Sequence, residues 1–139
     1  MSKIQQRIAC KALIIKDEKV LILREAPTYK DGTNIGRYHL PGGRIDPGEP
    51  FLEGLKREVY EETGLTVTVT APLFVGEWFP VIREVKNQIV AIFFVCLAKD
   101  DHVRLSEEHD DYLWIDPKEY KKYDLMKPED EVVQTYIEK

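Results

Sequence analysis

The stretch from Tyr38 to Leu65 reads YHLPGGRIDPGEPFLEGLKREVYEETGL, and its order of turn-forming and helix-forming residues decides the fold. Within Tyr38–Ile45, the sequence Pro41-Gly42-Gly43 interrupts a short run, which predicts a strand, a sharp turn and a second strand. Asp46-Pro47-Gly48 is a further turn signal. The first half of the stretch therefore predicts a tightly folded strand pair that leads into the next element.

That next element is a predicted helix from Phe51 to Thr63. Pro50 suits the first helical position, and Gly64 suits the residue just past a helix end. At about 100° per residue, one face of this helix carries a core stripe. The apolar residues of the stripe are Leu52, Leu55 and Val59.

A different face of the same helix carries Glu58, Glu61 and Glu62. Like charges four residues apart cost a few tenths of a kcal/mol on an exposed helix, so this cluster makes sense where a multivalent cation binds. Oxygen ligands without sulfur or imidazole favour Mg²⁺ or Mn²⁺ over zinc. Gly54 lies on the same face and could leave room for phosphates. For the local sequence alone, a solvated acidic face is the better explanation of the glutamates.

The spacing around the cluster changes that balance. Gly43 is followed after five residues by Glu49 and after seven more by Arg57-Glu58, and then come Val59, Glu61-Glu62 and Gly64-Leu65. These nine specified positions within 23 residues match the signature of the Nudix hydrolases, which the chain closely resembles. Tyr38 stands where family members often have Trp, which is a mild departure.

The rest of the chain is compatible with the fold that this resemblance implies, an α+β Nudix-type α/β/α sandwich with a mixed β-sheet, in one domain over residues 1–139. Further helices are expected after the capping-box sequence that begins at Asp116, and from Pro128 towards Ile137. A loop is expected from Glu25 to Gly36. The further expected strands are Arg7–Lys16, Lys19–Arg24, Leu65–Trp78, Asn87–Lys99 and Asp111–Ile115.

The resemblance also implies roles for individual residues. Glu58, Glu61, Glu62 and the carbonyl of Gly42 would hold Mg²⁺ or Mn²⁺. Arg57 would hold Glu49 in an ion pair that fixes the loop onto the helix. Gly43 would allow the tight turn, and Gly64 belongs to the structural part of the motif.

The catalytic base is open between two carboxylates. Glu58 is the first expectation, and some family members use a later loop, for which Ser106–Asp111 offers Glu108. A solvated loop explains that run equally well, and His39, His102 and His109 are expected to be structural or surface residues. With Arg57, these two glutamates are the expected catalytic residues.

Two further residues are candidates for substrate binding. Arg24 ends the second predicted strand, where many family members place an arginine that faces the substrate. Trp78, within Glu77–Pro80, offers an aromatic face on which a nucleobase can stack. A surface arginine and a core or rim tryptophan are the alternatives.

The implied reaction is hydrolysis of a phosphoanhydride in a nucleoside diphosphate linked to a further group. A nucleoside triphosphate, including oxidised dNTPs, is the first expectation for a short chain. ADP-ribose or a sugar nucleotide is the alternative, which Pro80 favours by its position fifteen residues after Leu65. Val81-Ile82-Arg83 lacks the tyrosine associated with dinucleoside polyphosphate cleavage. A non-catalytic nucleotide-sensing or RNA-end-binding module is a third alternative, although such proteins commonly lose motif residues that are intact here.

Composition limits the partners. The chain has 20 Lys+Arg against 25 Asp+Glu, a formal net charge of −5, so a broad electrostatic grip on nucleic acid is not expected. No apolar run is long enough to span a membrane, and no secretory signal is visible. Cys10 and Cys96 are expected to be buried, reduced thiols of a cytoplasmic protein. Family members are often dimers, which leaves a homodimer open.

Overall fold

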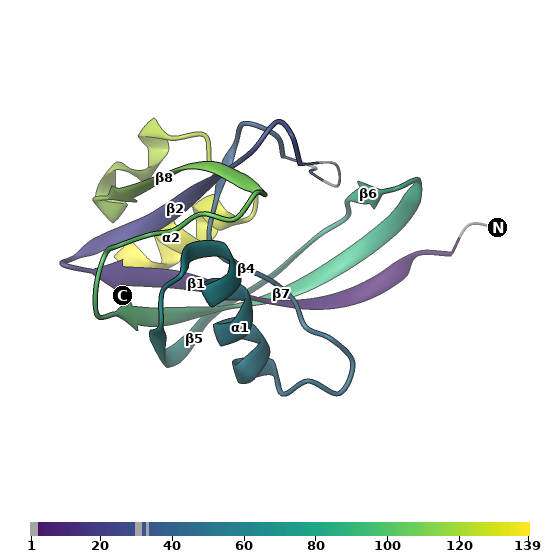
Figure 1. The fold of residues 1–139 in the computed structure, drawn as a ribbon, viewed down its shortest axis with the longest axis horizontal. Coiled ribbons are helices and arrows are strands. Elements are labelled where there is room, and N and C mark those ends of the chain that lie inside the picture. Colours follow the sequence, from purple (N-terminus) through teal and green to yellow (C-terminus); the bar gives the residue numbers. More distant parts are fainter. Residues whose placement is uncertain (1–2, 30–31, 33) are drawn as a thin grey trace.

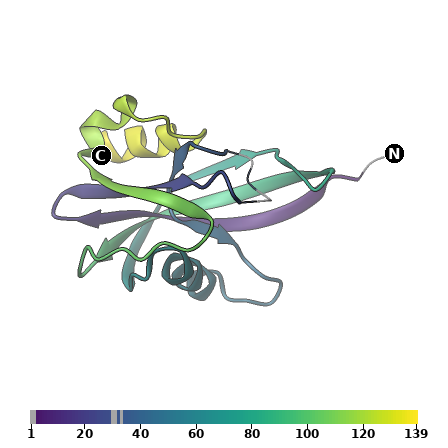
Figure 2. The same cartoon turned by 45° about the horizontal axis from the view of Figure 1, so that its top comes forward.

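The computed structural model describes residues 3–29, 32 and 34–139, and it shows a mixed sheet between helices (Figure 1). Helix α1 covers one face of the sheet, and helix α2 with the short helix η1 covers the other (Figure 2). The helices are α1 Phe51–Thr63, η1 Pro117–Lys122 and α2 Glu129–Ile137. The strands are β1 Gln5–Lys16, β2 Lys19–Glu25, β3 Tyr38–His39, β4 Gly42–Arg44, β5 Val67–Trp78, β6 Val81–Ile82, β7 Val85–Ala98 and β8 His109–Ile115.

The parallel pair β1 and β7 forms the centre of the sheet, in register from Gln5↔Asn87 to Ile15↔Leu97. The strand order is β3-β2-β1-β7-β5, and β4, β6 and β8 pair with β1, β7 and β2 respectively. All pairs except β1–β7 are antiparallel. The mixed sheet between helices is the α+β architecture that the sequence predicts.

Strand β1 is buried on both faces because the two helical layers use alternate residues along it. Ala9 and Leu13 belong to the apolar cluster under α2, whereas Cys10 and Ile14 belong to the cluster under α1. A polar side chain on this strand therefore enters the interior of the molecule, a point that becomes important at Lys11.

Helix α1 has the predicted bounds, with Gly64 in the left-handed conformation (φ 74°) that ends it. Pro50 is the residue before the helix rather than its first residue. Leu55 and Val59 are fully buried, but Leu52 is 40% exposed, so its assignment to the core was wrong. The helical period gives the direction of a side chain, but it does not tell how far the sheet extends beneath the first turn.

Two other local features differ from the predictions. The sequence after Asp116 forms a 3₁₀ helix, in which the Asp116 carboxylate accepts from the Lys118 N–H, and no side-chain bond from Glu119 back to the cap occurs among the described residues. The β6–β7 hairpin was missed because its turn, Arg83-Glu84, has positive φ without Gly or Asn. The predicted loop 25–36 includes residues 30, 31 and 33, which lie outside the described residues.

Candidate active site

The turn between β3 and β4 lies directly against the acidic face of α1. Gly42 has φ 137°, and a Cβ there would collide with the backbone of Cys10 on β1. A Cβ on Gly43 would lie 2.6 Å from Oε2 of Glu58. The N–H of Gly42 donates to Oε1 of Glu62 at 2.8 Å. The two glycines therefore allow a backbone approach that a side chain would block.

Arg57 joins the loop before α1 to the helix. Its Nε and Nη2 donate to the two oxygens of Glu49 at 2.7 and 3.0 Å, so the ion pair that the family resemblance implied is present. Hydrogen bonds from Arg57 and from the Asp46 N–H lower the pKa of Glu49 to about 2. The remaining Arg57 nitrogen, Nη1, contacts Glu58 at 3.1 Å and Glu61 at 3.2 Å. This one guanidinium thus holds the loop and orients two carboxylates.

The three glutamates of the helix have different surroundings. Glu58 and Glu62 line a cavity of about 480 Å³, whereas Glu61 is outside that lining, with its side chain 55% exposed. Burial raises the pKa of Glu62 well above its usual range, and the Gly42 N–H and the Lys11 charge oppose that shift. Burial also raises the pKa of Glu58, opposed by Arg57. The cost of ionising these two carboxylates is what a bound cation would offset.

The space beside Gly54 does not belong to this cavity. A Cβ on Gly54 would lie 2.6 Å from Cδ1 of Ile45 and 2.8 Å from Oε1 of Glu49. The expectation that this glycine leaves room for phosphates was therefore wrong, because the loop before the helix fills the space.

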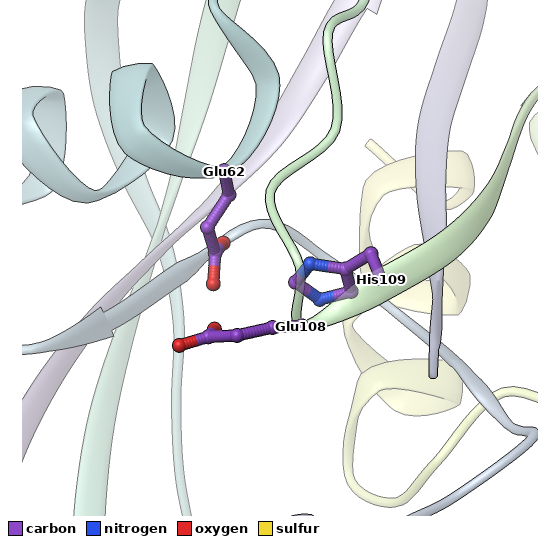
Figure 3. A group of neighbouring side chains, drawn as sticks. All are labelled: Glu62, Glu108 and His109. Atoms are coloured by element: carbon purple, nitrogen blue, oxygen red, sulfur yellow. The ribbon is translucent and has the colours of Figure 1, made fainter. Parts of the chain in front are cut away.

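The segment before β8 brings a further carboxylate to the helix. The Arg104 N–H donates to the Thr63 carbonyl at 2.7 Å, and the Glu108 carbonyl accepts from the Ala26 N–H at 2.8 Å. These bonds place Glu108 and His109 beside Glu62, with one ligand atom of each within 4.8 Å of the others. Figure 3 shows the three side chains converging from α1 and from the chain entering β8.

The contacts of His39 and His109 allow their tautomers to be assigned. Nδ1 of His39 lies 2.9 Å from the Leu40 carbonyl, which only accepts, and 3.2 Å from Nζ of Lys11, which only donates. We assign the hydrogen to this nitrogen from the shorter contact. Burial, together with the charge of Lys11, lowers the pKa of His39 well below its usual value, so the ring is neutral and its Nε2 is bare. Nε2 of His109 therefore donates to it at 2.7 Å.

It follows that Nδ1 of His109 carries a lone pair, and this buried atom has no partner among the described residues. Burial lowers the pKa of His109 to about 4, so the ring stays neutral near pH 7. Buried polar atoms without a partner are rare, and a bound ion is one explanation of such an atom. Beside Glu62 and Glu108, this lone pair completes a donor set that fits a divalent cation. The sequence predicted oxygen donors alone, so the imidazole is an addition.

The two candidates for substrate binding have different positions. Trp78, at the end of β5, lines the cavity. Arg24 is outside the lining, where it bonds to Asp110 at 2.8 Å and lies over the ring of Tyr38. Phe79 is 62% exposed and, like Glu77 and Pro80, does not line the cavity.

Lys11 on β1 is among the cavity residues that sequence reasoning missed. This lysine is 4% exposed and pairs with the buried Glu129 of α2 at 2.6 Å. The available signal was a lysine within the apolar run from Ile8 to Ile15, on a strand covered on both faces.

Comparison with known proteins identifies the family. The family model described as the NUDIX domain matches residues 5–136. The chain belongs to the Nudix hydrolase family. This Nudix hydrolase is 30% identical over 128 residues to a protein named nucleoside triphosphatase NudI from Escherichia coli O1:K1, covering 87% of this chain and 89% of that protein.

Solved structures agree with the assignment. The crystal structure of the MutT protein from Methanosarcina mazei Go1 superposes with a TM-score of 0.81 at 29% identity, covering 99% of this chain and 97% of that one. An ADP-ribose pyrophosphatase from Streptococcus suis has a TM-score of 0.71 at 17% identity, covering 95% and 90%, and shares the fold. Among the described residues of this Nudix hydrolase, no helix has the length and apolarity to cross a membrane.

Proposed function

We propose that this Nudix hydrolase cleaves a phosphoanhydride bond of a nucleoside triphosphate, including oxidised dNTPs, and releases pyrophosphate. The observation that carries the proposal is one cavity lined by Glu58, Glu62 and Glu108 and also by the aromatic ring of Trp78. Carboxylates that hold divalent ions suit a diphosphate, and an aromatic ring suits a base. The similarity to a protein named nucleoside triphosphatase supports the same substrate class.

Mg²⁺ or Mn²⁺ is the proposed cofactor. The carbonyl of Gly42 and the carboxylates of Glu58, Glu61 and Glu62 are its proposed ligands, and the position of His109 makes it a further candidate. A bound divalent ion supplies positive charge that neutralises the diphosphate and lowers the pKa of a coordinated water.

The chain's own residues provide orientation and accept a proton. Arg57 holds one oxygen of Glu58 at 3.1 Å, and Glu58 lines the cavity, where its second oxygen can take the proton of the attacking water. Glu108 is the alternative base, because it lines the same cavity from the opposite segment. Replacing each glutamate by Gln and comparing kcat separates the two assignments.

ADP-ribose or a sugar nucleotide is the second candidate substrate. Pro80 is the sequence feature that favours it, and this residue accepts a backbone bond from Asn87 at the β5–β6 connection, outside the cavity lining. Because Pro80 is not part of the cavity lining, the structure adds no support to this candidate, and we rank it second. A substrate contact of Arg24 stays a prediction.

The deciding experiment is product analysis with purified protein, Mg²⁺ and a panel of nucleotides. The proposal expects nucleoside monophosphate and pyrophosphate from triphosphates. AMP and ribose 5-phosphate from ADP-ribose, with intact triphosphates, would instead support the second candidate. Absence of hydrolysis across the panel with either Mg²⁺ or Mn²⁺ would contradict both.

The cellular location, the extent of the domain and the oligomeric state are also proposals. The buried free thiols of Cys10 and Cys96 suit a reducing compartment, which supports a cytoplasmic location. We propose that residues 1–139 act as one catalytic domain, of which the family model matches residues 5–136. A homodimer is an alternative to a monomer, and sedimentation would decide between them.

A further inference from the structure

Lys11 is a buried cation in the cavity wall, and the proposed hydrolysis gives it no role. It lies at the centre of β1, is 4% exposed, and lines the cavity next to Ala9, Ile89 and Trp78. A lysine is almost never this buried unless its ammonium is paired. Its presence among apolar neighbours therefore calls for a specific explanation.

The C-terminal helix supplies the group that holds Lys11. Oε2 of Glu129, the first residue of α2, accepts from the ammonium at 2.6 Å, and Glu129 is fully buried. The other oxygen of Glu129 accepts from the backbone N–H of Leu40, just before the glycine turn of the active site. The carboxylate thus ties the ammonium to the same turn that contacts Glu62.

The pair with Glu129 does not use all the hydrogen atoms of the ammonium. Lysine has three N–H donors and no acceptor. The contact with Nδ1 of His39, at 3.2 Å, uses at most one more of them. Among the described residues, at least one N–H of Lys11 therefore remains for a molecule in the cavity.

The neighbours of Lys11 indicate which part of a nucleotide supplies the acceptor. Nζ of Lys11 lies over the ring of Trp78, 5.6 Å from its centroid, so a base that stacks on this side of the ring places an edge near the ammonium. The phosphates are drawn instead to the glutamates that hold divalent ions. Of the edges of a stacked base, the one farthest from the sugar carries the group at purine position 6 or pyrimidine position 4, and we assign this edge to the buried ammonium. An ammonium, which only donates, favours a keto oxygen at that edge, because the oxygen accepts a hydrogen bond, and it disfavours an amino group, which donates.

We propose that Lys11 is a specificity-determining residue, which donates to a keto oxygen at purine position 6 or pyrimidine position 4, and that Glu129 is its positioning residue. This inference rests on the proposed nucleotide hydrolysis. It adds the substrate class, a nucleotide whose base carries a keto group on its outer edge, such as guanine, uracil or thymine.

Two matched pairs of triphosphates test the inference, because each pair differs in this keto oxygen. The first pair is inosine triphosphate and purine riboside triphosphate. The second pair is uridine triphosphate and 4-deoxyuridine triphosphate. For at least one pair, we expect the wild type to favour the keto substrate in kcat/KM by roughly 10- to 100-fold, as for a hydrogen bond to a charged donor. Lys11→Met, which keeps the aliphatic stem, should reduce that ratio to near 1.

If Lys11→Met alone does not fold, the double variant Lys11→Met/Glu129→Gln replaces it, because both members of the buried pair are then neutral. The ratio of kcat/KM between the two substrates of a pair should again be near 1. Glu129→Gln alone should lower the ratio, because the ammonium loses its charged anchor. A general loss of stability lowers the rates for both substrates of a pair and leaves their ratio unchanged. Lys99→Met, at an exposed lysine, is the matched control that should keep the wild-type ratio.

The outcomes separate this inference from the proposed function. Turnover by the wild type with ratios below about 3 in both pairs would overturn the role of Lys11 and leave the hydrolysis standing. The same follows if the Lys11 variants keep the wild-type preference. If the wild type releases pyrophosphate from none of the four triphosphates, the proposed function fails, and this inference fails with it.

Discussion

At the scale of single residues, a substitution at Gly43 should affect the activity much more than the stability. Its φ is not in the left-handed region, so alanine introduces no backbone strain. The added Cβ would instead displace the Glu58 carboxylate, which lies 2.6 Å away. We expect Gly43→Ala to lower kcat by more than about 10-fold, with a change in unfolding free energy below about 1 kcal/mol, because the mobile end of Glu58 can move aside. Steady-state kinetics and urea unfolding measure the two effects.

Gly48→Ala is the opposite case and serves as the control. Gly48 has φ 86°, and a Cβ there would meet nothing within 4 Å. The left-handed backbone should cost this variant about 1–2 kcal/mol of stability while kcat stays unchanged. If both variants lose activity in proportion to their stability, the contact between Gly43 and Glu58 has no catalytic importance.

Substitutions of Glu61 and Glu62 on α1 should differ in their effect on activity, although the family resemblance assigns both residues as metal ligands. Glu62 is buried in the cavity and bonded to Gly42, whereas Glu61 is exposed and bonded to Arg57. Glu62→Gln can still accept from Gly42, so the fold should persist, while kcat/KM falls by more than about 100-fold, beyond the effect of a residue that only supports a metal ligand. Glu61→Gln should also lower kcat/KM, by a smaller factor.

Circular dichroism of both variants verifies the fold, and kinetics at saturating Mg²⁺ gives the comparison. An equal loss in the two variants would show that Glu61 turns into the cavity when metal and substrate bind. Wild-type rates in Glu62→Gln would remove the central ligand of the proposed metal site.

At the scale of elements, the ion pair between Glu49 and Arg57 makes the attachment of the loop to α1 depend on pH. The pKa of Glu49 falls from 4.5 to about 2 in the folded protein. A depressed pKa contributes stability above the unfolded value, and that contribution is lost as the pH falls from about 4.5 to about 2. We therefore expect wild type and Glu49→Gln to differ in unfolding free energy by a constant amount above pH 5, and to converge below it.

Urea unfolding between pH 2 and pH 7 measures this convergence. Glu107→Gln is the matched control, since this exposed glutamate forms no ion pair within the part of the chain that the structure describes, and its curve should follow the wild type. A difference between wild type and Glu49→Gln that persists at pH 2 would mean that Arg57 stabilises the loop through other partners.

The elements show where sequence reasoning succeeds. Helix α1 and its loop were predictable because the turn residues, the helix ends and the motif all lie within Tyr38–Leu65 and act locally. Hairpin β6–β7 escaped because its turn uses Arg83-Glu84, which carries no turn signal. The contact of Glu108 and His109 with Glu62 depends on long-range pairing of β8 with β2, which no local pattern encodes.

At the scale of the whole molecule, buried polar residues link segments that the sequence keeps far apart. Lys11 on β1 meets Glu129 on α2, and His39 on β3 meets His109 on β8. Sequence patterns assign such residues by exposure statistics, which place lysine and glutamate on the surface. Their partners become evident only when the sheet is assembled. From the sequence, Glu62 and Glu108 could be named as candidates, but neither their contact with His109 nor the pair of Lys11 and Glu129 could be predicted.

The same assembly predicts that divalent ions stabilise the whole fold. The proposed ligands come from α1 and from the segment entering β8, so an ion bound to Glu62 and Glu108 joins two parts of the chain that have no such link when unfolded. Binding to the native state alone at a concentration 100 times Kd adds about 2.7 kcal/mol, which raises Tm by roughly 9 °C for a chain of this length. Thermal unfolding with MgCl₂, against NaCl at equal ionic strength, measures this shift.

Glu108→Gln should reduce the shift in Tm, whereas the neighbouring variant Glu107→Gln should keep it, since only the first removes a carboxylate from the cavity. A shift of the same size in all three proteins would place the stabilising ions elsewhere on this acidic surface and separate metal binding from the cluster around Glu62.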